Sequence, residues 1–191
     1  MRQILHMLIG TIIIIGLLLV PRPLSIILLF IIFLVSVLFS ILARKNKVSI
    51  VDFFIKNIER KNDEISFPGK GFIFFFAGCL LAVKLFPLDI ALASIAILTF
   101  GDSIANMTRK VYPIKNNGIF KNFAGSFVGL VVSFFAALIF VSPIYAGIAA
   151  IIGMLAESVY IRLGQSNADD NIIVPLAAGT ALYVLRFLIK V

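Results

Sequence analysis

The sequence of 191 residues has one cysteine, one histidine and no tryptophan, and only 14% of its residues are charged. The single cysteine, Cys79, excludes a disulfide within the chain and a zinc site built from cysteines. The hydrophobic share of 61% excludes a disordered chain. It also excludes an ordinary water-soluble domain, because a chain of this size has too little interior to bury so much apolar surface. The composition is that of an integral membrane protein.

Long apolar runs, separated by polar or proline-containing segments, predict an all-α transmembrane bundle of about seven spans, forming a single domain over residues 1–191. Proline cannot continue a helix and disfavours helix one residue upstream, so residues 20–23 and 142–143 are predicted to be tight turns. The first run has no small-residue cleavage site after it, and we expect it to be retained rather than removed as a signal peptide. The predicted spans are residues 3–20, 24–43, 71–86, 88–106, 125–141, 144–161 and 171–189.

The formal net charge is +8, from 17 Lys and Arg against 9 Asp and Glu. On a soluble protein this charge would suggest nucleic acid binding, but in a membrane protein basic loops set the orientation. Most of the basic residues fall at the N-terminus and in the second, fourth and sixth loops, which seven spans place on one side. The positive-inside rule puts that side, with the N-terminus, in the cytoplasm of a cell membrane, and no nucleic acid partner is expected.

The second loop, residues 44–70, is the longest polar segment. Ser49 to Asp52 resembles a capping box, and apolar and charged residues then alternate with helical spacing. The pattern predicts either a short amphipathic helix in the headgroup layer or a simple tether.

All nine acidic residues except Asp89 lie on the predicted cytoplasmic side or at the cytoplasmic ends of spans. An ionisable group within a span costs about 2.5–3.5 kcal/mol on insertion scales and is a functional candidate by default. Asp102 is the strongest candidate, because helical spacing puts it on one face with Asn106 and Arg109. Glu157, at the end of the sixth span, either pairs with a cation or takes part in chemistry.

Other polar residues have competing structural interpretations. Asp169 and Asp170 open the last span and suit a helix N-cap, but two adjacent acids exceed what capping needs. His6 is either a harmless interfacial side chain or a functional one. Lys84 and Arg186 are expected to extend to the opposite membrane interface.

Several carboxylates near lysines and glycines, without a cysteine or histidine cluster, indicate Mg²⁺ and phosphate chemistry. Residues 115–126 supply lysines and then Gly125 at a helix start, where anions are favoured. Gly125 and Gly129 also form a GxxxG pair, which close helix packing explains without chemistry. The chain has no Walker A motif, kinase-type glycine-rich loop or hydrolase serine elbow.

These residues, in this order, resemble the CTP-dependent lipid kinases, a family that includes dolichol kinase, phytol kinase and a CTP-type diacylglycerol kinase and is distantly related to phosphatidate cytidylyltransferase. Arg109 stands where the family pattern has glycine, and Gln3 where it has lysine. The matching residues are Arg2, His6, Gly69 to Gly71, Gly101, Asp102, Ala105, Lys121, Gly125, Ser126, Glu157, Asp169 to Asn171, and Pro175.

The resemblance implies phosphoryl transfer from CTP to the hydroxyl of a membrane lipid alcohol, most simply an isoprenoid alcohol of the polyprenol or dolichol type. It implies that Asp102, Asp169 and Asp170 hold Mg²⁺ on the triphosphate, with Asp102 and Asp170 at the reacting groups. Glu157 or His6 would orient or deprotonate the alcohol. The residues implied in nucleotide binding are Arg2, Lys70, Asn106, Lys121, Gly125, Ser126 and Asn171.

The sequence leaves three alternatives to this function. In the first the acceptor is diacylglycerol, in the second the reaction is cytidylyl transfer to a phospholipid, and in the third the chain is a small transporter. The C-terminal Lys-Asp and Asp-Arg signature associated with the cytidylyltransferase is missing from this sequence. A transport path should place polar residues at several depths, whereas here they cluster at one end of the spans.

Overall fold

The computed structural model describes residues 2–45, 69–113, 122–159, 162–163, 166–167 and 169–189. The predicted amphipathic helix of the second loop lies outside the described residues. Within them the structure is helical except for one antiparallel pair of two-residue strands, β1 (Arg162–Leu163) and β2 (Ser166–Asn167). The predicted all-α class is therefore confirmed.

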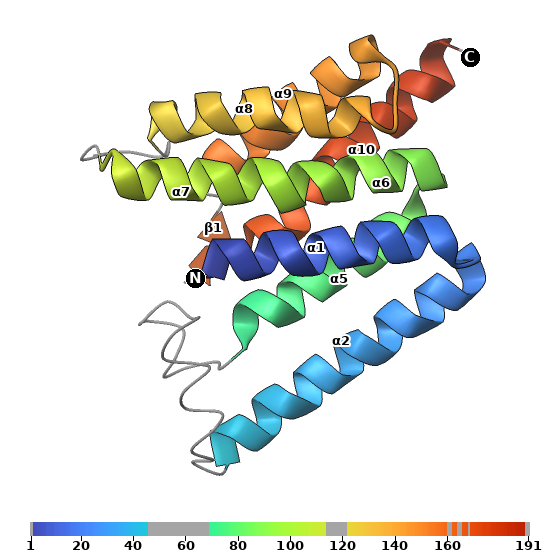
Figure 1. The fold of residues 1–191 in the computed structure, drawn as a ribbon, viewed down its shortest axis with the longest axis vertical. Helices are drawn as coiled ribbons and strands as arrows, with labels where there is room; N and C mark the ends of the chain where they lie inside the picture. The colour runs from blue at the N-terminus through green and yellow to red at the C-terminus, as the bar shows by residue number, and fades with distance from the viewer. Residues whose placement is uncertain are drawn as a thin grey trace.

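The described helices form seven rods that alternate in direction (Figure 1). One rod is continuous but changes geometry, from α6 through the π-helix η1 to α7. The elements are α1 (Arg2–Leu19), α2 (Arg22–Lys45), α5 (Lys70–Leu85), α6 (Leu88–Ala96), η1 (Ile97–Asp102), α7 (Ser103–Val111), α8 (Phe123–Leu138), α9 (Pro143–Ser158) and α10 (Asp170–Ile189).

Each predicted span corresponds to one rod, with boundaries that differ by a few residues. The largest difference is in the fourth span, which was predicted to end at residue 106 and continues to Val111. The two predicted turns are present: Pro21 lies between α1 and α2, and Ser142 is the N-cap of α9 with Pro143 in its first turn. Both prolines stand where a helix loses no backbone hydrogen bond.

Four helices are long and apolar enough to cross a membrane: Arg2–Leu19, Arg22–Ala43, Leu88–Val111 and Asp170–Leu188. α5, α8 and α9 have 16 residues each, a length of about 24 Å against a hydrocarbon layer of about 30 Å. For these three, membrane crossing stays a prediction.

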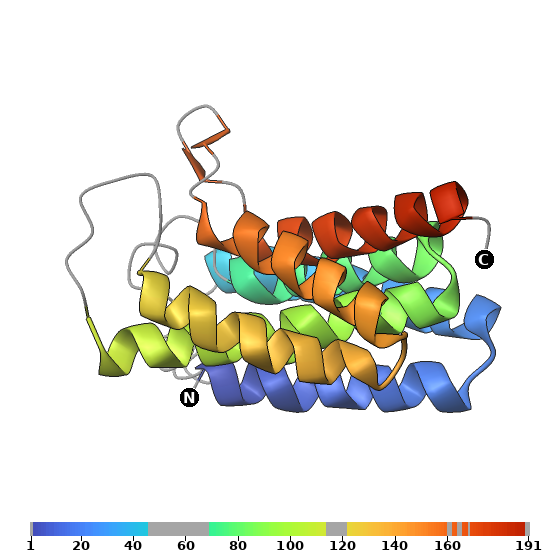
Figure 2. The ribbon, with the colours of Figure 1, turned by 90° about the horizontal axis from the view of Figure 1, so that it is seen from above.

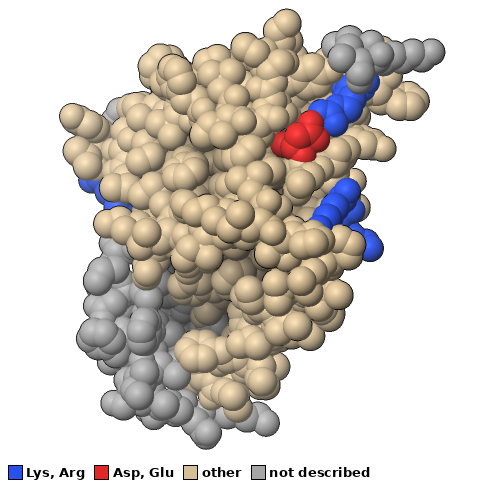
Figure 3. Space-filling view, turned by 45° about the vertical axis from the view of Figure 1, so that its right-hand side comes forward, with Lys and Arg blue, Asp and Glu red and all other residues tan. Residues whose placement is uncertain are grey.

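The rod α6–η1–α7 is the centre of the bundle, and 78% of the residues in its most apolar stretch are buried. α2 is at the other extreme: only 11% of the residues in its most apolar stretch are buried, and Figure 1 shows this helix splayed away from the rest. Large apolar side chains cover the outer faces, and the face in Figure 3 is almost free of charge outside one acidic patch and a few basic ones. Examples of the exposed side chains are Ile12, Leu19, Leu38, Phe135 and Phe187.

Two sets of polar contacts stabilise the end of the bundle that carries the α1–α2 and α5–α6 connections. Arg22 caps the C-terminus of α5, because its guanidinium donates to the carbonyls of Val83 and Phe86, each at 2.7 Å. Arg186 of α10 forms a two-point ion pair with Asp89 of α6. The prediction that Arg186 merely extends to an interface omitted this partner, which lies 97 residues away in the sequence.

Candidate functional site

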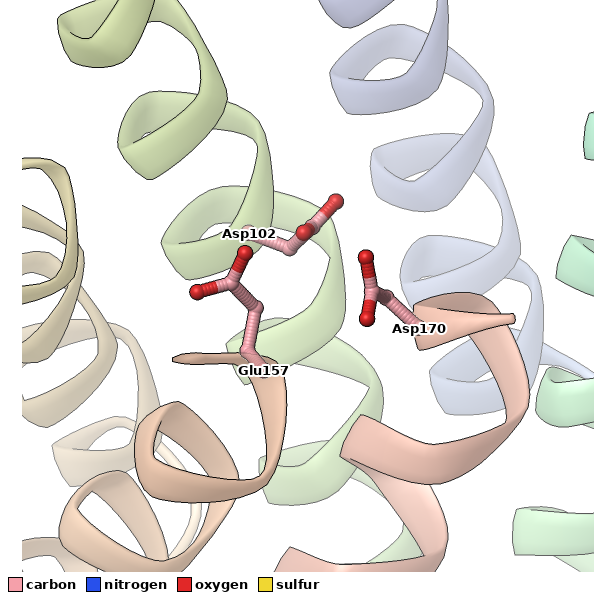
Figure 4. Close-up of side chains that lie close together, drawn as sticks. All are labelled: Asp102, Glu157 and Asp170. Carbon is pink, nitrogen blue, oxygen red and sulfur yellow. The ribbon is translucent and has the colours of Figure 1, made fainter. Parts of the chain in front are cut away.

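Three carboxylates from three different rods meet at the opposite end of the bundle. Asp102 is the last residue of η1, Glu157 lies near the end of α9, and Asp170 begins α10. Each offers one oxygen, and the three oxygens all lie within 4.8 Å of one another (Figure 4). The sequence placed these three acids at the same end of the spans, and the structure brings their oxygens together there.

The alternating direction of the helices explains this meeting. α7 and α9 end, and α10 begins, at the same end of the bundle (Figure 2). Asp102 is 6% exposed and Glu157 is fully buried. Charged groups are placed in such an environment only where partners or a bound cation compensate for lost hydration.

The π-helix places Asp102 in the group. A π-turn inserts about one residue into the helical ladder, which offsets the following side chains by about 100° from their positions in an uninterrupted α-helix. Gly101 allows close contact here, because a Cβ at this position would lie 1.9 Å from Ser133 Oγ of α8. The 3.6-residue periodicity of the sequence gave no sign of this element.

Arg109 holds Glu157 from the side of α7. Its Nη1 donates to Glu157 Oε1 at 2.5 Å and its Nη2 to Oε2 at 2.7 Å. Nη2 also donates to Ser126 Oγ at 2.8 Å, and Ser158 Oγ donates to Ser126 Oγ at 2.7 Å. The ion-pair interpretation of Glu157 is therefore confirmed, and the same carboxylate belongs to the acidic group.

Asn106 supports Asp102 from one helical turn away. Its Nδ2 donates to Asp102 Oδ1 at 2.8 Å and to the Asp102 carbonyl at 3.0 Å. Asp102, Asn106 and Arg109 share a helical face, as predicted, but Asn106 and Arg109 bind different carboxylates. Asn106 orients one carboxylate, and Arg109 reaches across to Glu157.

Asp169 lies beside the three-carboxylate group but is not one of its members. Its Oδ1 accepts from the Asn171 backbone N–H at 3.1 Å and from Asn171 Nδ2 at 2.7 Å, so it caps the start of α10. Asn171 Nδ2 also approaches the Gly71 carbonyl of α5 at 3.5 Å. Of the two adjacent acids, one serves the helix end and the other joins the group, and the metal role predicted for Asp169 stays a prediction.

Arg2 and His6 of α1 line a small cavity next to Gly71, Phe72 and Phe75 of α5. Its volume of about 20 Å³ suits roughly one water molecule. The His6 ring packs on Phe75, with 4.1 Å between centroids, and within the described residues its buried Nε2 has no hydrogen-bond partner. A Cβ on Gly71 would lie 3.4 Å from Arg2 Nη2, so the α5 start must approach Arg2 closely.

The remaining predicted binding residues divide into three cases. Gly125 is buried against α7, where a Cβ would lie 2.5 Å from Arg109 Cγ and 2.7 Å from the Ala105 carbonyl, so the packing interpretation is confirmed. Lys70 begins α5 directly after Gly69, whose backbone φ of 80° is a conformation that favours glycine. The Nζ of Lys70 lies 5.9 Å from the Phe74 ring centre. Lys121 lies outside the described residues.

The sequence predicted that Arg109 shares a helical face with Asp102 and Asn106, but it did not predict that Arg109 pairs with Glu157. It also gave no role to Ser158, whose hydroxyl donates to Ser126 Oγ. Ser158 follows Glu157 directly, and nothing in the sequence distinguishes it from a serine at a helix end.

The donor set suits a hard divalent cation. Mg²⁺ takes oxygen ligands at 2.0–2.1 Å, so oxygens that share one ion lie at most about 4.2 Å apart. The observed limit of 4.8 Å is within a small side-chain rotation of that value. The residues present therefore fit a magnesium site formed by Asp102, Asp170 and Glu157.

Comparison with known proteins found no match: no family model, no curated protein and no solved structure matches this chain.

Proposed function

We propose that this chain is a membrane-embedded lipid kinase that transfers a phosphoryl group from CTP to an isoprenoid alcohol at the cytoplasmic face of a cell membrane. The observation that carries the proposal is the meeting of Asp102, Glu157 and Asp170 at one end of an otherwise apolar bundle. The choice of CTP and of an isoprenoid alcohol follows from the family resemblance in the sequence.

The proposed arrangement in the membrane uses all seven rods, with the N-terminus and the acidic group on the cytoplasmic side. The exposed apolar side chains on the outer faces support insertion. The basic loops at the acidic end support the orientation, because positive charge is retained on the cytoplasmic side.

The reaction forms a bond between the alcohol oxygen and the γ-phosphorus of CTP. The bond from the γ-phosphorus to the bridging oxygen breaks, CDP leaves with that electron pair, and the alcohol proton passes to a carboxylate. Mg²⁺, when bound, neutralises charge on the phosphates. Asp102 and Asp170 would hold the ion together with one oxygen of Glu157, and Asn106 and Arg109 keep Asp102 and Glu157 in place.

Glu157 is the better of the two candidates for interaction with the alcohol. It belongs to the carboxylate group, whereas His6 packs on Phe75 in a separate small cavity with Arg2. Lys70 and Asn171 lie at the adjoining starts of α5 and α10, and Arg2 of α1 contacts the start of α5 near Gly71, which suits a role with the triphosphate.

The test is a transfer assay with purified protein, Mg²⁺ and CTP labelled either in the γ-phosphate or in the cytosine ring. We expect γ-label in an isoprenoid alcohol phosphate, with diacylglycerol as the competing acceptor. Cytosine label in a lipid, with release of pyrophosphate, would instead identify cytidylyl transfer. No labelled lipid with any acceptor would overturn the proposal.

Variants sharpen the assay. Asp102→Asn and Asp170→Asn should each lower turnover by at least about 100-fold, the typical loss when a preorganised electrostatic group is removed. Asp89→Asn is the matched control, because it removes the same charge at the opposite end of the bundle. Equal activity in all three variants would contradict the assignment of the site.

A further inference from the structure

A groove lies between α8 and α9, two neighbouring helices on one side of the bundle (Figure 2). Its volume of about 390 Å³ is within the range of small-molecule sites. Phe127, Ile151 and Leu155 are about half exposed, so the groove opens on the outer face, where the proposed arrangement puts lipid. The apolar walls are formed by Phe123, Phe127, Leu130, Ile151, Met154 and Leu155.

The two remaining lining residues, Ser126 and Ser158, are the polar part of the groove. Ser158 follows Glu157 in the chain, and Ser126 accepts a hydrogen bond from Arg109, which in turn holds both oxygens of Glu157. Hydrogen bonds through Ser126 and Arg109 therefore connect the polar end of the groove to the acidic group. An apolar groove that ends in hydroxyls beside a reaction centre matches a molecule with a hydrocarbon chain and a polar head.

We propose that this groove binds the hydrocarbon chain of the acceptor alcohol, with the hydroxyl at Ser126 and Ser158. The inference rests on the proposed function and specifies where its lipid substrate lies. The hydroxyl of an alcohol bound in this way lies beside Ser158, which follows Glu157 in the chain, and is linked to the acidic group through Ser126 and Arg109. Ser126, implied by the resemblance to bind the nucleotide, then serves the alcohol instead.

The first arm of the test fills the groove. Leu130→Trp and Ile151→Trp should each raise the KM for the alcohol by about tenfold or more and leave the KM for CTP unchanged, because each adds bulk where the chain lies. Val131→Trp is the matched control: Val131 is exposed on α8 but does not line the groove. Ser126→Ala should raise the KM for the alcohol by up to about tenfold, the equivalent of one hydrogen bond.

The second arm does not depend on turnover. Geranylgeraniol with a diazirine on its chain is photolysed with the full-length protein, and the labelled peptides are identified by mass spectrometry. We expect labels within α8 and α9, reduced in Leu130→Trp and Ile151→Trp but not in Val131→Trp, and displaced by geranylgeraniol but not by phosphatidylcholine.

The outcomes separate the two proposals. Specific labelling of the groove in a protein that transfers no phosphoryl group would support the groove and overturn the kinase function. Transfer activity with wild-type KM in both tryptophan variants would overturn the groove alone. Displacement of the label by phosphatidylcholine would identify bulk membrane lipid as the occupant and would also overturn the groove proposal.

Discussion

Glu157 is fully buried and has both carboxylate oxygens bound by Arg109, which lies 48 residues earlier in the chain. Removing one partner of such a pair leaves an uncompensated charge where water cannot reach it. Here the effect is increased by Asp102 and Asp170, whose oxygens lie within 4.8 Å of the same group. Arg109 is therefore a structural requirement of the site as well as a part of it.

We expect Arg109→Ala to destabilise the protein by about 3–5 kcal/mol, the usual cost of breaking a buried pair. The measurement is thermal unfolding in detergent, followed by the reaction of Cys79 with a fluorogenic maleimide. Cys79 suits this assay because it is the only cysteine and is fully buried. The Arg109→Met, Glu157→Gln double variant should recover much of the loss, whereas equal instability in both variants would show that the pair itself is not responsible.

Magnesium should stabilise the folded protein through the same three carboxylates. A ligand that binds only the folded state adds about 2.7 kcal/mol at 100 times its Kd, so the maleimide-detected melting temperature should rise with Mg²⁺ concentration. Asp102→Asn and Asp170→Asn should abolish the rise, and Asp89→Asn should keep it. An identical rise in every variant would indicate binding elsewhere, including lipid headgroups.

The sequence predicted that the acids lie at one end of the bundle, because helices that alternate in direction return every second terminus to the same end. It did not predict how Arg109 is used. Whether Arg109 faces Asp102, Glu157 or solvent depends on the rotation of α7, and that rotation depends on a π-helix that hydrophobic periodicity does not reveal. The sequence also could not show which of Asp169 and Asp170 caps α10, since either of two adjacent acids can cap a helix and the backbone geometry decides between them.

At the scale of elements, η1 depends on a close fit between α8 and the centre of the bundle. Gly101→Ala should cost about 1–3 kcal/mol, because the new Cβ would overlap Ser133 Oγ. Ser133→Ala should recover part of this loss by removing the nearest atom. The readout is again the unfolding temperature reported by Cys79, together with the proposed phosphoryl transfer, because movement of η1 would displace Asp102.

A glycine in an uncrowded helix position is the control for this experiment. Among the described residues, the atom nearest to an added Cβ on Gly147 of α9 is Phe134 Cε2, at 3.9 Å. Gly147→Ala should be neutral or stabilise by about 0.5–1 kcal/mol, since alanine is the better helix former. If both alanine variants behave alike, crowding at η1 is not what requires glycine.

At the scale of the whole molecule, the two ends of the bundle differ in chemistry. One end holds the carboxylate group with Arg109, and the other holds Asp89 with Arg186 and the capping contacts of Arg22. Between them, and before Asp102, the buried residues of α6 and η1 are apolar except for Ser94 and Thr99. A chemical step at a single membrane face agrees with this distribution better than a polar path across the membrane does.

The orientation follows from which end faces the cytoplasm, and cysteine labelling in cells tests it directly. Two cysteine substitutions are suitable reporters, Ser142→Cys and Tyr112→Cys. Ser142 lies in the exposed turn between α8 and α9, and Tyr112 lies at the C-terminus of α7, at the acidic end of the bundle. We expect a membrane-impermeant maleimide to label Ser142→Cys in intact cells and Tyr112→Cys only after permeabilisation. The wild-type protein is the background, because buried Cys79 should not react in the folded state. The reverse pattern would place the acidic group outside, where cytosolic CTP cannot reach it, and would contradict the proposed function.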